Sequence, residues 1–305
     1  MGWRECLARS VDEIGPMPRG RYLPRPEPAQ EWVSGVQLIE PGYLSAAIRR
    51  ARPVAQDGPR DRDVRVAVSR MTRQYVASLT CVALAGLAQG MGIDLSPTRV
   101  SALIRYNVPY AVTVDTEPLF CKERPVDEPA IETRAQLREY VWTNLYARNL
   151  RELFRAATAL VRVPERLLWT NAAEWVAIVL DSAVEYLPPE RADVFAQECQ
   201  ALLNADTLPG FDANPLRGLV EWVPFDGEEI QTRHLCCLVY LHSDRQGRLC
   251  QNCPLLPLPD RAALVRERRG VGMTGPGGPA ERRSMEIGVR RLAITRESAR
   301  SRPDG

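Results

Sequence analysis

Lysine is almost absent from this chain of 305 residues: Lys122 is the one lysine among its 40 basic residues. The arginines are spread along the whole chain, so we interpret the skew as a bias in composition and not as a binding surface. Acidic residues nearly balance the basic ones, at a formal net charge of +2. The sequence therefore lacks the excess positive charge typical of nucleic-acid and membrane-surface proteins, and we expect no nucleic-acid partner.

We expect no secretory leader either. The first residues lack the apolar run of a secretory signal and place Glu5 in its position. Residues 75–93 carry no charge and are long enough to cross a bilayer, but three glycines and several polar side chains lower their apolarity. We expect a buried core helix there and no stable membrane span. The prediction is a cytoplasmic protein with reduced cysteines, and peripheral attachment to the inner face of the membrane stays open.

The sequence also lacks a glycine-rich dinucleotide-binding motif. The nearest match, residues 270–275, directly precedes Pro276 and follows no predicted strand. Since the fingerprint needs a strand before it and a helix after it, we expect no built-in dinucleotide site. Electrons for any redox reaction would have to come from a separate donor.

Apolar residues recur at helical spacing over much of the chain. The predicted helices cover residues 43–52, 64–90, 131–161, 167–187 and 189–203, and a short helix is predicted from Ser96-Pro97 to residue 104. Strands are predicted at residues 110–114, at a sheet edge, and 218–223, with a turn at Asp226-Gly227. The fold class is therefore mainly α with a small β component (α+β), a helical bundle followed by a compact C-terminal segment that carries cysteines.

The same patterns divide the chain into four regions. Residues 1–62 form an N-terminal arm, proline-rich at residues 16–30, and the first helix. Residues 63–217 form a mostly helical region, and residues 218–262 hold a short strand and a cysteine-bearing segment. Residues 270–305 show no sustained helical or strand periodicity of apolar residues and are predicted to be a mobile tail.

Four of the eight cysteines lie within 18 residues: Cys236, Cys237, Cys250 and Cys253. The last two are separated by two residues, which lets a tight turn bring both sulfurs to one metal. Adjacent side chains of an extended chain point to opposite faces, so the doublet reaches a common centre only from a turn or bulge. Gly247, within the intervening 12 residues, could reverse the chain. We therefore favour a shared iron-sulfur centre.

Other interpretations of these residues stay open. A structural zinc site normally takes two Cys-x-x-Cys or Cys-x-x-His knuckles, and this chain offers one knuckle and a doublet. A Rieske centre would need His234 and His242, the two histidines of the chain, although four cysteines already complete a ligand set. Surface or turn positions are the favoured interpretation of both histidines. The remaining alternative is a group of buried thiols without a metal.

Near the end of a mostly helical chain, the order Arg-x-x-Cys-Cys and then Cys-x-x-Cys-Pro-Leu resembles the FhuF-like ferric siderophore reductases, which bind a 2Fe-2S cluster. The resemblance covers residues 165–258. It implies that the four cysteines are the cluster ligands and the catalytic electron-transfer groups, and that Arg233 matches an arginine preceding the doublet. Residues 168–173 resemble a Leu-Trp-x-Asn stretch of the family. The gap of 12 residues is longer by two than is usual there, which puts the exposure and potential of the cluster in doubt, not its ligation.

The resemblance implies a ferric siderophore reductase that reduces siderophore-bound Fe(III) to Fe(II) by one electron and releases iron in the cytoplasm. The expected partners are a hydroxamate-type ferric siderophore, bound by the helical region, and a separate electron donor such as a ferredoxin or flavin reductase. Arg233 would supply a hydrogen bond or a positive charge that raises the cluster potential, with a plain surface residue as the alternative.

Two other functions stay open at this point. One is a ferredoxin-like electron carrier or redox sensor with the same 2Fe-2S cluster, and the other is a zinc-stabilised siderophore-binding protein without redox activity. Trp142, Trp169 and Trp175 lie at helical spacing and are predicted to be core residues more than pocket residues. The three cysteines at positions 81, 121 and 199 have no partner at ligand spacing and are predicted to be buried.

Overall fold

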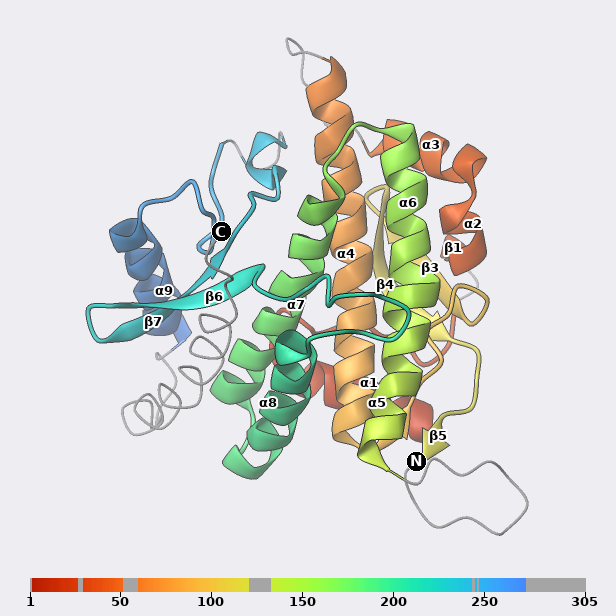
Figure 1. The fold of residues 1–305 in the computed structure, drawn as a ribbon, viewed down its shortest axis with the longest axis horizontal. Helices are drawn as coiled ribbons and strands as arrows, with labels where there is room; N and C mark the ends of the chain where they lie inside the picture. The colour runs from red at the N-terminus through yellow and green to blue at the C-terminus, as the bar shows by residue number, and fades with distance from the viewer. Residues whose placement is uncertain are drawn as a thin grey trace.

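The computed structural model describes residues 2–26, 30–51, 60–120, 133–242, 245 and 247–272. Within these residues the fold is mainly helical with short antiparallel strands, which confirms the predicted fold class (Figure 1). Most of the predicted tail, from residue 273 onward, lies outside the described residues. The division into four regions stays a prediction.

The helices are α1 (Trp3–Glu13), α2 (Gly35–Ile39), α3 (Pro41–Arg50), α4 (Arg60–Ala88), α5 (Arg134–Trp142), α6 (Arg151–Leu160), α7 (Glu165–Tyr186), α8 (Pro189–Asn204) and α9 (Leu258–Gly272), with the π-helical segment η1 (Thr143–Leu150) and the 3-10 turn η2 (Val239–Leu241). The strands are β1 (Trp32–Ser34), β2 (Met91–Gly92), β3 (Val100–Arg105), β4 (Val108–Val114), β5 (Leu119–Phe120), β6 (Val220–Phe225) and β7 (Glu228–Arg233). Every predicted long helix is present. Helices α1, α2 and α9 and strands β1, β2, β5 and β7 were not predicted.

Helix α4 is the central element of the fold and packs against α7 and α8 (Figure 1). Nearly all of its side chains from Tyr75 to Leu87 are buried, because this stretch is uncharged and other elements surround it. Helix α7 is, among the described residues, the one helix whose length and composition would suit a bilayer, but 89% of its most apolar window is buried inside the protein. Both segments therefore act as core helices in this structure.

The predicted helix over residues 131–161 is present from Arg134 to Leu160 as α5, η1 and α6 in direct succession. It begins at a capping box, in which Thr133 accepts from the amide of Gln136 and the Gln136 side chain accepts from the amide of Thr133. In the π-helical part, the buried Asn149 side chain donates to the carbonyl of Leu95 at 2.6 Å and to the hydroxyl of Tyr75 at 3.2 Å. These bonds tie the segment to α4 and to the loop before β3.

The predicted short helix from Ser96-Pro97 to residue 104 is wrong. Residues 96–99 form a turn closed by a bond from the Arg99 amide to the Ser96 carbonyl, and Val100–Arg105 is strand β3, paired with β1 and β4. A Ser-Pro pair opens turns as readily as helices, and pairing across the sheet decided between them. The strand predicted at residues 110–114 is β4, which begins at Val108 and lies at the sheet edge as expected.

A second hairpin follows the helical region. The predicted turn at Asp226-Gly227 is confirmed, since both residues have positive φ, as a tight two-residue hairpin requires. Strand β6 contributes the wholly buried Trp222 to the main core, and its indole donates to Asp181 of α7 at 3.2 Å. Strand β7 and α9 close around a separate small core. We call residues 228–272 the cysteine unit and residues 60–204 the helical body.

Candidate functional site

The cysteine doublet lies in an irregular turn directly after β7, as the sequence required for two adjacent sulfurs to face one centre. Leu238, the residue after the doublet, has a left-handed backbone at φ 62°. Gly247 has a φ of 76°, as expected for a chain reversal before the second pair of cysteines. The knuckle itself is closed by a bond of 3.0 Å from the Cys253 amide to the Cys250 carbonyl.

The four sulfurs come together as two close pairs. The Sγ atoms of Cys236 and Cys253 are 3.7 Å apart, and those of Cys237 and Cys250 are 3.9 Å apart. Two thiolates bonded tetrahedrally to one metal at about 2.3 Å lie about 3.8 Å from each other. Each pair therefore has the separation of two ligands on one metal ion. No group of three or more His, Cys, Asp or Glu side chains in the described part of the chain is arranged to hold a single ion.

Two of the four thiols are biased toward the thiolate, which is the form that binds metals. The hydrogen bond that Cys253 shares with Cys236 lowers the pKa of Cys253 to about 7. Hydrogen bonds with Cys236 and Cys250 lower the pKa of Cys237, and the positive charges of Arg73 and Arg233 act in the same direction. The same hydrogen bonds raise the pKa of Cys236 and of Cys250, so one cysteine of each close pair favours the thiolate and the other keeps its proton.

Arg233 is completely buried beside the doublet, so the alternative of a plain surface residue is wrong. Its Nη1 donates to Oε2 of Glu174 at 2.7 Å and its Nη2 to Oδ1 of Asn171 at 2.6 Å. Its Nε donates to the carbonyl of Leu235, next to the cysteines, at 2.6 Å. The guanidinium thus joins the turn that carries Cys236 to helix α7.

Glu174 is the centre of this network. Its buried carboxylate also accepts from Nε of Arg73 on α4 at 2.8 Å and from Nδ2 of Asn252, between Cys250 and Cys253, at 2.8 Å. Burial alone would raise the pKa of this carboxyl, but the two arginines outweigh it and hold the pKa below the ordinary value. One carboxylate therefore connects α4, α7, β7 and the Cys-x-x-Cys turn.

A second set of bonds fixes the backbone of the doublet. The hydroxyl of Ser69 on α4 donates to the carbonyl of Cys237 at 2.6 Å and accepts from the side chain of Asn171 at 3.2 Å. Asn171 is the asparagine of the Leu-Trp-x-Asn stretch, so this stretch contacts both Arg233 and the serine that binds the doublet. Sequence reasoning missed Ser69, Arg73, Glu174 and Asn252. One signal existed, because Glu174 is the only charged residue between residues 167 and 180.

The two histidines contact residues outside the cysteine set. His242 is buried, not at the surface, and its Nε2 accepts from Nη1 of Arg70 at 2.5 Å. His234 is partly exposed, and its Nε2 is 3.7 Å from a carboxylate oxygen of Glu221. The expectation was a surface or turn position, and His242 is buried but lies in a turn, at the end of η2.

The other candidate side chains belong to the core. Trp169 and Trp175 are buried and Trp142 is partly buried against the same core, as predicted. Cys81 and Cys199 are buried, which raises the pKa of both thiols, for Cys81 to about 12. The third of these cysteines, at position 121, lies outside the described residues.

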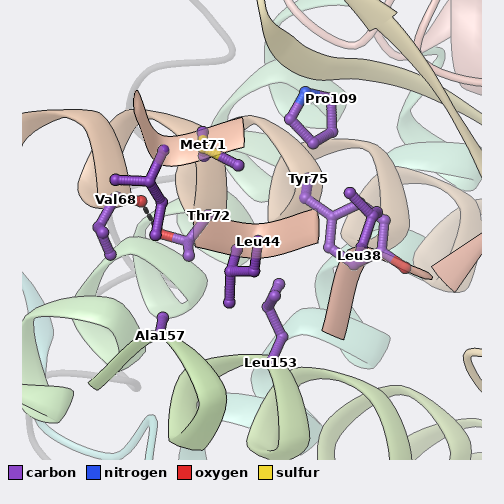
Figure 2. Close-up of a pocket in the computed structure, with 10 residues that line it drawn as sticks. Leu38, Leu44, Val68, Met71, Thr72, Tyr75, Pro109, Leu153 and Ala157 are labelled. Atoms are coloured by element: carbon purple, nitrogen blue, oxygen red, sulfur yellow. Dashed lines mark hydrogen bonds between the residues drawn. The ribbon is translucent and has the colours of Figure 1, made fainter. Parts of the chain in front are cut away.

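A small apolar cavity of about 10 Å³, with room for little more than one water molecule, lies between α2, α3, α4 and α6 (Figure 2). Helix α4 contributes Val68, Met71, Thr72 and Tyr75 to its wall. At about 100° per residue, the centre of this group lies roughly 130° around α4 from Ser69 and Arg73. The cavity is thus separated from the cysteines by the helix, and its apolar wall has no charged group for a polar iron chelate. We do not assign the siderophore to it.

Comparison with protein families connects this architecture to iron metabolism. The model of a family described as "Ferric iron reductase FhuF-like transporter" matches residues 72–222. The chain belongs to the FhuF-like family. The match includes Arg73, Asn171 and Glu174, three members of the network beneath the cysteines. It ends before Arg233 and the four cysteines, so their assignment rests on the motif and on the geometry given above.

A comparison with solved structures finds an aerobactin synthetase, IucC, from a hypervirulent pathotype of Klebsiella pneumoniae. The TM-score is 0.40 at 15% sequence identity, over 62% of this FhuF-like chain and 36% of the synthetase. This chain thus spans about a third of the length of that protein, and the likeness carries no argument about function. A comparison with curated proteins finds no match.

Proposed function

We propose that this FhuF-like protein is a ferric siderophore reductase whose four cysteines hold a 2Fe-2S cluster. The observation that carries the proposal is the arrangement of the sulfurs in two pairs, with separations of 3.7 Å and 3.9 Å, above a buried arginine network. The family match supports a role in ferric iron reduction. Cytoplasmic location and a siderophore-binding helical region at residues 63–217 are parts of the same proposal.

The sulfur pairs suggest how the ligands would be shared. Cys236 and Cys253 would bind one iron, and Cys237 and Cys250 would bind the other. A 2Fe-2S cluster bound in this way supplies one electron at a time. The protein contributes donors around the sulfurs, namely the Leu238 amide, 3.4 Å from Sγ of Cys236, and Nη2 of Arg245, 3.8 Å from Sγ of Cys250. Hydrogen bonds of this kind stabilise negative charge on sulfur and raise the reduction potential.

Reduction by a single electron is sufficient to release siderophore iron. Hard oxygen donors bind Fe(III) tightly because of its high charge, and their affinity for Fe(II) is much lower. One electron from a separate donor, such as a ferredoxin or flavin reductase, converts Fe(III) to Fe(II), and no bond within the siderophore is broken. The substrate class that the family resemblance favours is a ferric hydroxamate siderophore.

The test starts with the protein purified under anaerobic conditions. We expect a red-brown visible spectrum and, after dithionite, a rhombic EPR signal from one electron. A ferric hydroxamate siderophore added with an Fe(II)-trapping chelator should remove that signal and form the Fe(II) complex in equal amount. A reduced cluster that reacts with no siderophore would favour an electron carrier or sensor, and a colourless protein that contains zinc would contradict both.

A further inference from the structure

We propose that Arg73, Glu174 and Arg233 set the reduction potential of the metal centre through their net charge. We call these three side chains the charge triad. The inference rests on the cluster of the proposed function, but not on its substrate. The triad is a positioning and tuning device, because its members act on the sulfurs and not on the siderophore.

The triad is a buried group of unequal charges. Both guanidiniums reach the same oxygen, Oε2 of Glu174, from Arg73 at 2.8 Å and from Arg233 at 2.7 Å. The side chains of Glu174 and Arg233 are wholly buried, and that of Arg73 is 15% exposed. Two positive charges and one negative charge leave an excess of +1, which solvent screens little at this depth.

The excess charge lies directly beneath the four cysteines. Arg233 bonds to the carbonyl of Leu235, and Asn252, which lies between two cysteines, bonds to the triad carboxylate. Arg73 lies about one turn along α4 from Ser69, whose hydroxyl donates to the carbonyl of Cys237. Negative charge on the sulfurs is therefore stabilised by the triad.

The same interaction bears on electron affinity. A cluster gains one negative charge on reduction, so a positive charge nearby stabilises the reduced form more than the oxidised form. The sign of the effect follows the net charge of the triad. Removing an arginine must lower the potential, and neutralising Glu174 must raise it, although both changes break the same ion pair.

Because the two variants should shift the potential in opposite directions, the measurement distinguishes an effect of charge from an effect of disrupted structure. We would measure the midpoint potential by an EPR-monitored redox titration of Glu174→Gln, Arg73→Gln and the double variant, without siderophore. The net charge of the triad becomes +2, 0 and +1 in these three proteins. We expect a rise for the first and a fall for the second, each a tenfold or larger change in the equilibrium constant, or about 59 mV for one electron. The double variant should return close to the wild-type value.

The chain offers a matched control. Glu198 of α8 is also wholly buried and binds two arginines, Arg134 at 2.8 Å and Arg138 at 2.7 Å. This group belongs to α5 and α8, and Arg134 also bonds to the carbonyl of Leu87 near the end of α4. Glu198→Gln should therefore leave the potential unchanged. Arg73→Lys keeps the charge and should also stay near the wild-type potential.

Several outcomes would overturn the inference. These are shifts of the same sign for Glu174→Gln and Arg73→Gln, no shift in either, or a shift for Glu198→Gln as large as that for Glu174→Gln. A shift for Arg73→Lys as large as that for Arg73→Gln would assign the effect to geometry. If Arg73→Gln fails to keep a cluster, the rise expected for Glu174→Gln against its Glu198→Gln control still decides the question.

Failure of the proposed function gives a different result. If the cluster titrates with the predicted signs but reduces no ferric siderophore, the reductase proposal fails and the charge triad stands. A wild-type protein that assembles no cluster would overturn both.

Discussion

The helical body and the cysteine unit are held together by different forces. The helical body buries a continuous apolar core made largely by α4, α7 and α8. In the cysteine unit, the separate core among the described residues has three buried members, Ile230, Ala262 and Val265. The contact between unit and body is instead strongly polar, through Arg233, Glu174 and their partners. Apolar burial therefore stabilises the body, whereas buried hydrogen bonds and ion pairs hold the unit against it, together with Leu235 and Leu238, which pack on the main core.

The buried polar contact between unit and body costs desolvation energy but fixes the position of the cysteines. Buried ion pairs contribute little net stability, because each charge must lose its hydration. Breaking one by removing a single partner is nevertheless severe, because the remaining charge stays buried without compensation. A polar contact between unit and body therefore stabilises one arrangement of the cysteines and also places charge beside them. An apolar contact would not place charge there.

The largest effect is expected from the cysteines. Cys236→Ser or Cys253→Ser should abolish the visible absorption of the proposed cluster, because each would remove one of its proposed ligands, while the far-UV circular dichroism of the helical body stays largely unchanged. Cys6→Ser is the matched control, since Cys6 lies in α1 and its thiol bonds to Gln89. It should keep the full spectrum. If both ligand variants stay coloured, the ligand assignment is wrong.

The second largest effect is expected for Glu174→Ala, which should disrupt the polar contact between the cysteine unit and the helical body. It leaves the wholly buried Arg233 without a carboxylate, a change that costs about 3–5 kcal/mol for buried pairs. Hydrogen exchange should increase mainly over residues 233–242 and 247–256.

The comparison for that variant is Glu198→Ala. The partners of Glu198 are partly exposed, at 41% for Arg134 and 24% for Arg138, so water can solvate them when the carboxylate is lost. We expect a smaller loss of stability and unchanged exchange over the cysteine residues. Equal protection changes in both variants would contradict the separation of unit and body.

Leu168→Ala probes the body alone. The Leu168 side chain is completely buried in α7, and truncation of such residues costs about 2–5 kcal/mol through lost burial and a cavity. Denaturant unfolding should show this loss, while the protein that remains folded keeps its visible spectrum. Loss of the spectrum ahead of unfolding would show that the body and the unit are not independent.

Asn171→Ala should have a more moderate effect. It removes one acceptor from the Arg233 guanidinium and one donor to the Ser69 hydroxyl, and buried groups left unsatisfied cost about 1–3 kcal/mol. Thermal unfolding measures the loss. Asn171→Asp keeps the acceptor, so it should retain more stability than the alanine variant. A larger loss for the aspartate would argue against the Arg233 contact.

The smallest effect is expected at a surface ion pair between the helical body and α1. Arg191 of α8 bonds to Glu13 of α1 at 2.7 Å, but both side chains are 41% exposed. Screening by solvent limits such pairs to about 0–1 kcal/mol. Arg191→Ala should therefore change denaturant unfolding little, and a loss as large as that of Glu174→Ala would contradict the contrast between exposed and buried pairs.

The sequence by itself determined the long helices, the hairpin turn and the set of four cysteines. Helical periodicity and ligand spacing are local properties, expressed within a few residues of one another. Where local signals were weak or ambiguous, the prediction failed. Strand β7 has one apolar residue, Ile230, in its sequence, and the Ser-Pro pair before β3 suits a turn as well as a helix.

Only the tertiary structure decided what surrounds the cysteines. Arg73 meets Glu174 across 101 residues, Asn252 meets it across 78, and Arg233 across 59. Such pairs produce no periodicity or motif spacing in the sequence, because they form only when α4, α7 and β7 pack together. The sequence thus determined which sulfur atoms are the candidate metal ligands. The packing of the helices decided which charge lies beside them, since burial makes that charge effective.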